Sequence, residues 1–349
     1  MEKSPRLKSV NYSEEGIPDG TPTYLFDQAE TYNRDAHEAG LEWFLEAYLG
    51  LSVFYGLTSL TGQREDDCCA VGWNQEAHRQ RLRDFKCPRF DAMEIVELAI
   101  AAGARYISMP ARYRDGFALY NSACNAFNSV KSEACRDLVG EMASACECHG
   151  LGLHLVLSHG FNAMLVKPGE NPDDAWRRHL EQVTEEIHEL LIGYGPLAAI
   201  SLEGIDIARA HHPSQSDCQS LYDYMHSLQP QLLVGYQQGL LGTEDFHSVE
   251  EKLPTRNDDV ARQGYVLSHG EKPVEIRRSL TPARLSYDPY AAGTHLKTDA
   301  IWEALALSRR NNANLLVNTA LMPDGSLDLE DINSLLAVGE RMESGGLPR

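Results

Sequence analysis

The chain has 349 residues, of which 43% are hydrophobic and 23% charged, a composition typical of globular proteins and not of disordered or fibrous ones. Its 51 acidic and 31 basic side chains give a formal net charge of −20. Such a surface repels phosphate backbones and anionic lipid, so we expect no nucleic-acid or membrane partner and favour a small neutral or cationic ligand. The same charge also serves solubility alone.

Strand-like and helical patterns alternate along most of the chain. The first 40 residues are polar and weakly patterned, and we treat 1–40 as an N-terminal extension. Short β-branched or apolar runs predict strands at Leu51–Tyr55, Arg105–Met109, Leu153–Ser158, Leu197–Leu202, Gln231–Tyr236, Val274–Arg278 and Asn314–Thr319. Amphipathic stretches predict helices from a capping box at Asp91 and Glu94 to Gly103, and at Glu133–Cys148, Pro172–Leu191, Ser216–Leu228, Thr298–Asn311 and Leu329–Met342.

This alternation predicts an α/β fold with parallel strands and crossover helices, either a closed barrel or a doubly wound sheet. No GxGxxG or GxxxxGK[ST] motif follows a strand, so nothing marks a nucleotide-binding sheet. Polar residues follow several strands, as at the catalytic end of a barrel. We therefore predict a TIM-like (β/α)8 barrel over 41–343 with a tail at 344–349, and a long loop at 239–270 over its active face.

Targeting signals and metal motifs are absent from the sequence. No apolar run follows the first residues, and no 18 consecutive apolar residues occur, so we expect neither a signal peptide nor a membrane span. Eight scattered cysteines without a CxxC pair favour reduced thiols. We expect a cytoplasmic protein with no cofactor and no metal; His211 and His212 lack matched acidic spacing. The oligomeric state stays open.

Several segments, in order, carry a family resemblance. They are Phe90-Asp91-Ala92 through Gly103-Ala104-Arg105-Tyr106, Arg114-Asp115-Gly116-Phe117-Ala118-Leu119-Tyr120, Phe127-Asn128-Ser129-Val130, Arg136-Asp137-Leu138-Val139-Gly140-Glu141, Glu189-Leu190-Leu191, Tyr194-Gly195-Pro196, Asn314-Leu315-Leu316-Val317-Asn318 and Met322-Pro323-Asp324-Gly325. Together they resemble the α-L-fucosidases of glycoside hydrolase family 29. The resemblance implies a retaining glycosidase barrel, and the chain stops before the β-sandwich that usually follows it in the family.

The resemblance also assigns the nucleophile position. Where the family has "WFDG" after its fourth strand, this chain has Ser201-Leu202-Glu203-Gly204, so Glu203 stands in place of the aspartate. The extra methylene moves the carboxylate by about 1 Å, a displacement that can cost on the order of a hundredfold in rate. A second carboxyl about 5–5.5 Å away is what retaining hydrolysis requires. Glu203 can alternatively cap a loop or pair with Arg114.

The family's sugar-binding residues are mostly replaced. Its "HWG" reads Phe54-Tyr55-Gly56, its "KHHDGF" reads Arg112-Tyr113-Arg114-Asp115-Gly116-Phe117, and Ser201 replaces a tryptophan. Because a site without the partners of a substrate's hydroxyls rejects that substrate, an ordinary fucoside is not the expected ligand. We predict a rebuilt pocket lined by Phe54, Tyr55, Tyr113, Arg114, Asp115 and Ser201.

The acid/base position has three candidates. Glu250 lies in a segment similar to the family's "DxxTPE" loop, and Glu275 aligns with the glutamate of the next strand. His159, just after the third strand, is a rim histidine that can work as acid or base near neutral pH. Each of them can also be a structural or solvated side chain.

Three functional hypotheses follow. The first is a divergent fucosidase-like glycoside hydrolase that uses Glu203 on a small-molecule glycoside other than an ordinary α-L-fucoside. The second is a repurposed barrel enzyme that performs elimination, cyclisation or isomerisation on a sugar-derived or secondary metabolite. The third is a carbohydrate-binding pseudoenzyme without catalysis.

Overall fold

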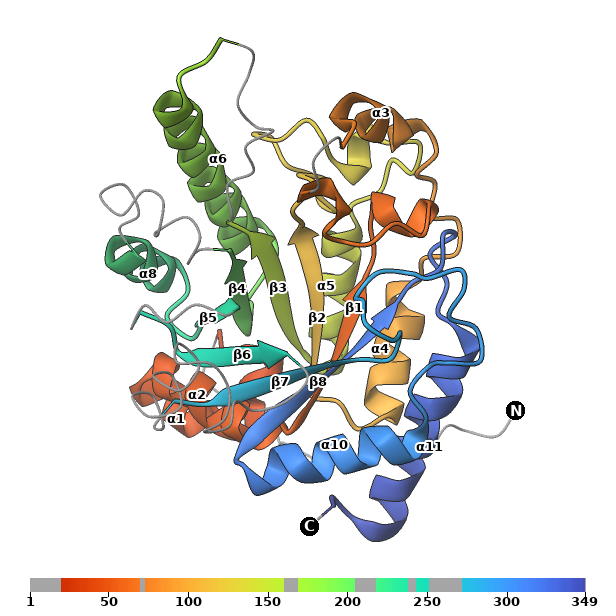
Figure 1. The fold of residues 1–349 in the computed structure, drawn as a ribbon. Helices are drawn as coiled ribbons and strands as arrows, with labels where there is room; N and C mark the ends of the chain where they lie inside the picture. The colour runs from red at the N-terminus through yellow and green to blue at the C-terminus, as the bar shows by residue number, and fades with distance from the viewer. Residues whose placement is uncertain are drawn as a thin grey trace, which may run out of the picture.

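The protein forms a closed barrel of eight parallel strands, in chain order, in the computed structural model (Figure 1). The structure describes residues 20–69, 73–159, 169–204, 218–237, 243–250 and 272–348. The strands are β1 (Leu49–Phe54), β2 (Tyr106–Arg112), β3 (Gly152–Ser158), β4 (Ala199–Glu203), β5 (Leu233–Gln237), β6 (Phe246–Glu250), β7 (Val274–Ser279) and β8 (Ala313–Ala320). The predicted α/β class and (β/α)8 barrel are confirmed.

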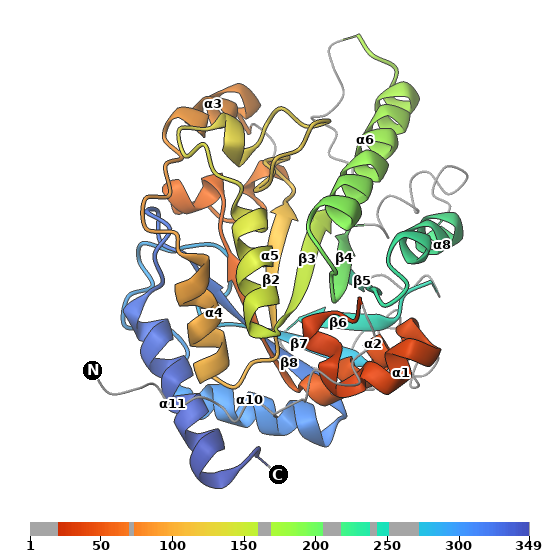
Figure 2. The same ribbon diagram turned by 180° about the vertical axis from the view of Figure 1, so that it is seen from behind.

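Helices cover the outside of the barrel. They are α4 (Ala92–Ala101), α5 (Leu138–His149), α6 (Pro172–Gly193), α8 (Cys218–Leu228), α10 (Thr298–Arg310) and α11 (Leu329–Gly345). Figure 2 shows α4, α5 and α6 along the outer side of β2 to β4. None of the described helices is both long and apolar enough to cross a membrane.

Local capping decides where two of these helices begin. The Asp91 carboxylate accepts hydrogen bonds from the backbone N–H groups of Met93 and Glu94, at 2.9 and 3.2 Å, and so starts α4 as predicted. The next helix, α5, begins at Leu138 and not near 133. Asp137 accepts a hydrogen bond from the Gly140 N–H at 2.8 Å, and this cap sets the start.

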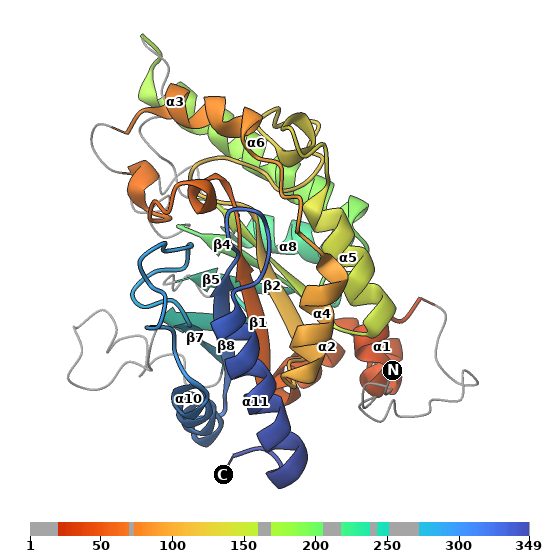
Figure 3. The same ribbon diagram turned by 90° about the vertical axis from the view of Figure 1, so that its right-hand side faces the viewer.

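The amino-terminal end of the barrel is closed by two helices that the sequence pattern does not indicate, α1 (Ala29–Arg34) and α2 (Ala36–Ala47). Figure 3 shows them beneath the barrel, at the end opposite α3 (Gln75–Gln80). Phe44 of α2 packs with ring centroids 4.7 Å from Phe246 and 6.0 Å from Tyr106. This aromatic cluster seals that end against water.

Strand β6 corrects the sequence-based expectation of a long loop over 239–270. Residues 246–250 pair with β5 and β7, and only the flanking parts of that stretch lie outside the described residues. The sequence of β6 contains no apolar run, because the side chains that face the barrel interior include polar ones. Ser248, for example, donates a hydrogen bond to Glu275 at 2.9 Å across the interior.

Candidate active site

Glu203 lies at the carboxyl end of β4, inside the mouth of the barrel. Its side chain is 1% exposed. The Tyr113 hydroxyl donates to Oε1 at 3.3 Å, and Nε of Arg114 donates to Oε2, also at 3.3 Å. Both donors come from the loop after β2, whereas Glu203 is the last residue of β4. The site thus combines residues from two strand ends of the barrel. Three of the predicted site residues are therefore brought together.

Two opposing effects act on the pKa of Glu203. Burial raises the pKa of Glu203 above that of an ordinary glutamate, because water no longer solvates its charge. The cations Arg114 and Arg277 favour the ionised form and offset part of that rise. A carboxyl group with a raised pKa, placed at the rim of a barrel strand, is typical of a group that transfers protons or attacks a substrate.

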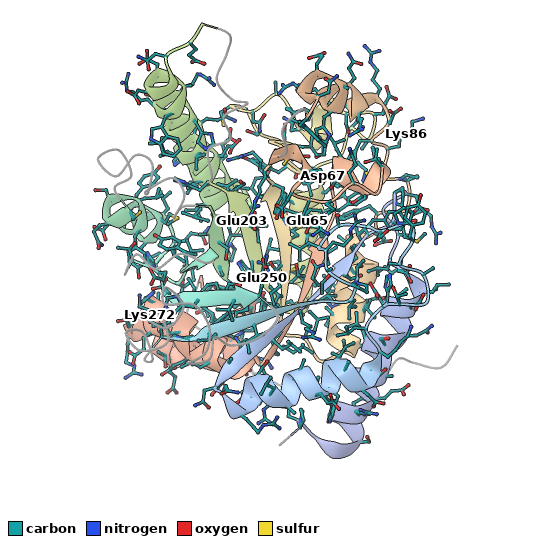
Figure 4. All side chains as sticks on the ribbon, in the orientation of Figure 1. Glu65, Asp67, Lys86, Glu203, Glu250 and Lys272 are labelled. Carbon is teal, nitrogen blue, oxygen red and sulfur yellow. The ribbon has the colours of Figure 1, made fainter. Side chains whose placement is uncertain are left out.

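A second carboxyl group, from Asp66, lies on the other side of the same guanidinium. Arg114 Nη1 donates to Asp66 Oδ1 at 2.5 Å. Partial burial and the negative charges of Glu65 and Glu250 raise the pKa of Asp66, while Arg114 lowers it. Asp66 is a residue that the sequence analysis misses, although the acidic run Glu65-Asp66-Asp67 after the first strand is a signal for it. Figure 4 labels Glu65, Glu203 and Glu250.

The two remaining glutamate candidates lie at different depths of the barrel. Glu250 is the last residue of β6 and is exposed, within electrostatic reach of Asp66. Glu275 is fully buried near the start of β7, where it accepts hydrogen bonds from Tyr106 at 2.8 Å and Ser248 at 2.9 Å. Glu275 is the second residue of β7, and the start of a strand lies at the amino end of the barrel. The carboxyl group of Glu275 therefore lies at the closed amino end and not at the mouth.

His159 is close to Glu203 along the rim. Its backbone N–H donates to the Glu203 carbonyl oxygen at 2.8 Å, and its own carbonyl oxygen accepts from His179 at 3.1 Å. Burial, followed by repulsion from Arg112, lowers the pKa of His159 to about 4. An imidazole with that pKa is neutral near pH 7, which does not suit a general acid.

Two of the predicted pocket residues, Tyr55 and Asp115, face other parts of the structure. Tyr55 donates its hydroxyl to the Pro323 carbonyl oxygen at 3.1 Å. Asp115 accepts from His78 at 2.9 Å and from the Phe117 N–H at 3.0 Å, which fixes its loop. These contacts are structural.

Of the other two, Phe54 contacts the site and Ser201 lies one level below it on β4. Phe54 packs edge-on against Tyr113, with ring centroids 5.0 Å apart, while the Ser201 hydroxyl, below Glu203 on β4, bonds to Nε2 of His154 at 2.7 Å.

One group of side chains has the composition of a metal site. His37, His226 and Asp245 lie outside the barrel lumen with their ligand atoms within 4.8 Å of one another. Asp245 already accepts from His37 at 3.0 Å and from the Tyr222 hydroxyl at 2.5 Å, so His37 and Asp245 form a hydrogen-bonded pair, with His226 Nε2 3.6 Å from the same carboxylate. The histidines at 211 and 212 lie outside the described residues.

The closed barrel of eight parallel strands defines this chain as a (β/α)8 protein, and the candidate site lies at the carboxyl ends of its strands. The profile of one family, alpha-L-fucosidase, matches residues 26–346. The chain therefore belongs to the α-L-fucosidase family, and the resemblance read from its motifs is confirmed.

Individual relatives are distant and longer. Alpha-L-fucosidase 1 of Arabidopsis thaliana is 25% identical over 223 residues, covering 57% of this chain and 41% of the plant protein. Tissue alpha-L-fucosidase of Rattus norvegicus is 28% identical over 174 residues, covering 44% of this chain and 37% of the rat protein. The matched stretches thus span less than half the length of these relatives.

Solved structures share the fold. Alpha-L-fucosidase isoenzyme 1 from Paenibacillus thiaminolyticus has a TM-score of 0.73 at 22% identity, covering 89% of this chain and 77% of that protein. An alpha-L-fucosidase of family GH29 from Bacteroides thetaiotaomicron has a TM-score of 0.76 at 17% identity, covering 87% of this chain and 73% of that protein. At these identities the likeness concerns the barrel alone.

Proposed function

We propose that this protein is a glycoside hydrolase with a carboxylate-based retaining mechanism, acting on a glycoside other than an ordinary α-L-fucoside. The observation that carries the proposal is that Glu203 lies between Tyr113 and Arg114 at the barrel mouth. The motif resemblance assigns the role of nucleophile to the same residue. In this mechanism Glu203 attacks the anomeric carbon, and a second carboxyl group protonates the leaving oxygen and later activates water.

The acid/base role falls to the acidic pair of Asp66 and Glu250. Partial burial and the neighbouring negative charges favour a proton on Asp66, which suits a general acid. Arg114 lies between Asp66 and Glu203 and balances both charges. Substrate moves into the space that these three side chains share, with Phe54 and Tyr113 as an aromatic wall.

The substrate differs from a fucoside because the family's histidines and tryptophan are replaced. Tyr113 and Arg114 occupy the histidine positions and are already bonded to Glu203, so they orient the carboxylate and leave fewer groups for sugar hydroxyls. A cytoplasmic location and a small carbohydrate or sugar-like substrate, with no nucleic-acid or membrane partner, remain part of this proposal.

Turnover of 4-nitrophenyl glycosides of several sugars by the wild type and by Glu203→Gln tests the proposal. We expect hydrolysis of at least one glycoside by the wild type, at a rate above that on the α-L-fucoside, and none by the variant. The exposed residue Glu303 provides a matched control, and Glu303→Gln should keep the full rate. Equal rates in wild type and Glu203→Gln would contradict the assignment.

The acid/base residue is tested with leaving groups of different basicity. Loss of the general acid slows substrates with alkoxide leaving groups far more than 4-nitrophenyl substrates, because nitrophenolate leaves without a proton. We expect this pattern for Asp66→Asn. The same pattern in Glu250→Gln alone would assign the role to Glu250 and contradict the assignment to Asp66.

One observation favours a second candidate function, proton transfer without glycoside cleavage. Glu203 is buried and its pKa is raised, as in enzymes whose carboxyl group moves protons during elimination, cyclisation or isomerisation. Wild-type turnover of a sugar-derived substrate without release of an aglycone would support it. Ligand binding without turnover of any kind would instead support a pseudoenzyme.

A further inference from the structure

Arg277, in the middle of β7, faces the interior of the barrel. The residues two positions before and after it do so as well: Glu275 bonds to Ser248, and the Ser279 hydroxyl accepts from Asn318 of β8 at 3.2 Å. Because side chains alternate along a strand, Arg277 points to the same side. It is only 5% exposed.

This guanidinium is buried without an anion. In the ranges of the chain that the structure describes, no carboxylate lies at ion-pairing distance from Arg277, and its buried Nε has no hydrogen-bond partner. Arg112, buried to the same degree, shows the ordinary arrangement. Its Nε donates to Glu186 at 2.5 Å and its Nη2 to the Ser158 carbonyl oxygen at 2.5 Å.

The cation lies between the closed amino end and the barrel mouth. Its charge lowers the pKa of Glu203 on one side and the pKa of both Glu275 and His154 on the other. The backbone of Arg277 pairs with that of Glu250, at the end of β6. Arg277 is therefore below the carboxyl groups of the proposed site and directed toward the same interior.

An unpaired charge in a buried position is strongly unfavourable, and folded proteins keep one where a ligand completes the pair. We infer that Arg277 binds the carboxylate of an acidic sugar, so that the substrate at Glu203 is a glycoside of a sugar acid. This inference rests on the proposed function and names its substrate class.

A sugar acid fits better than a free inorganic anion for two reasons. The planar guanidinium fork matches the two oxygens of a carboxylate. With a net charge of −20, the protein repels a multiply charged ion such as phosphate more than it repels a single carboxylate. Ser52, Asn318 and Ser279 are joined by hydrogen bonds across β1, β8 and β7, and they form a polar surface that the hydroxyl groups of a bound sugar would contact.

The charge inside the barrel thus favours a different class of ligand from the net charge of the whole chain. A net charge of −20 favours a neutral or cationic ligand, whereas the interior holds a cation that no described carboxylate neutralises. Composition does not reveal this, because it averages over the surface and the lumen.

Calorimetric binding of paired ligands tests the inference without requiring turnover. The pairs are D-galacturonate with D-galactose, D-glucuronate with D-glucose, and L-iduronate with L-idose; acetate and inorganic phosphate represent anions without a sugar ring. We expect at least one acid to bind the wild type about tenfold or more tightly than its neutral partner, and more tightly than acetate or phosphate. Arg277→Met should lose this preference and Arg277→Lys should keep part of it.

Two controls keep the outcome interpretable. Arg341 forms a surface ion pair with Asp299, so Arg341→Met removes an equal charge far from the lumen and should leave the preference unchanged. In the absence of ligand, Arg277→Met should unfold at the same or a higher temperature than wild type. A large fall in that temperature would show that Arg277 already has a partner and would overturn the inference.

The remaining outcomes separate this inference from the proposed function. If no acid binds better than its neutral partner, or if the preference survives in Arg277→Met, the inference fails even where neutral glycosides are hydrolysed. If an acid binds through Arg277 but its 4-nitrophenyl glycoside is not cleaved, the inference stands and the proposed hydrolysis fails. Acetate or phosphate binding as tightly as every acid would mean a general anion site and would also overturn the inference.

Discussion

The two ends of the barrel interior use similar polar side chains in opposite ways. At the amino end, Tyr106 and Ser248 donate to the buried Glu275, and the aromatic cluster beneath them excludes water. At the carboxyl end, Glu203 and Asp66 share one arginine. The amino end is organised for stability, whereas the carboxyl end gathers two carboxyl groups around one arginine, an arrangement that fits the proposed site.

The largest difference between the ends should appear in turnover. Glu203→Gln removes the attacking carboxylate without changing its size, and the rate should fall by a factor on the order of 10³ or more while the unfolding temperature changes little. Steady-state rates and thermal unfolding measure both effects. A comparable loss of rate in a variant confined to the amino end would contradict this division between the two ends.

Removal of the buried ion pair between Arg112 and Glu186 should lower the stability of the fold. Arg112→Met leaves the buried Glu186 carboxylate without its cation and should reduce the free energy of unfolding by about 3–5 kcal/mol. The matched change Arg277→Met removes a cation that has no described partner, and it should leave the free energy unchanged or raise it. Chemical denaturation of the two variants measures the difference. Equal losses would mean that both arginines are structural.

The pH dependence of the rate should reflect the raised pKa of Glu203. The nucleophile has to be ionised, so kcat/KM should fall about tenfold per unit as the pH drops below that pKa. Because burial raises the pKa of Glu203, the acidic inflection should lie above the ordinary value of 4.5. A pH profile of the wild type locates it, and an inflection at or below 4.5 would be inconsistent with this environment.

The amino end should affect stability but not rate. Tyr106→Phe deletes one of the two hydrogen bonds to the buried Glu275 carboxyl group and should cost about 1–3 kcal/mol of unfolding free energy. The turnover of the folded variant should match that of the wild type, since Tyr106 lies at the far end of the lumen. A changed substrate preference in this variant would mean that the two ends are coupled.

The smallest effect should come from the ion pair outside the lumen. The hydrogen bond to Asp245 raises the pKa of His37 above 6.5, so the pair stabilises the fold fully below the unfolded pKa and loses this contribution as the pH rises through the folded pKa. His37 is about one-third exposed, and His37→Gln should cost only about 0.2–1 kcal/mol at acidic pH and nothing at alkaline pH. Unfolding at pH 5.5 and 9 compares the two.

The barrel is predictable from the sequence because parallel strands buried on both faces leave apolar runs. Strand β6 is not predictable in this way, since the polar residues Ser248 and Glu250 interrupt its apolar pattern. Helix α2 is not indicated either, because it buries its aromatic side chains under the barrel and not along a sheet face.

The site was predictable only where a motif or a strand end pointed to it. Glu203, Tyr113 and Arg114 follow strands and do converge. Asp66 lies in the loop after β1, and Arg277 lies in the middle of β7. Neither position directly follows a strand end, and only the closed barrel brings both residues near Glu203. Glu275 shows the converse, because sequence order does not reveal how deep in the lumen a strand residue sits.

The most direct test of the account is trapping of the covalent intermediate. A panel of 2-deoxy-2-fluoroglycosyl fluorides, including those of sugar acids, slows breakdown of a glycosyl-enzyme ester so that intact-protein and peptide mass spectrometry can locate it. We predict one adduct, on the peptide that carries Glu203, and none in Glu203→Gln. Turnover of the panel without any adduct, or an adduct on Asp66 or Glu250, would contradict Glu203 as the nucleophile.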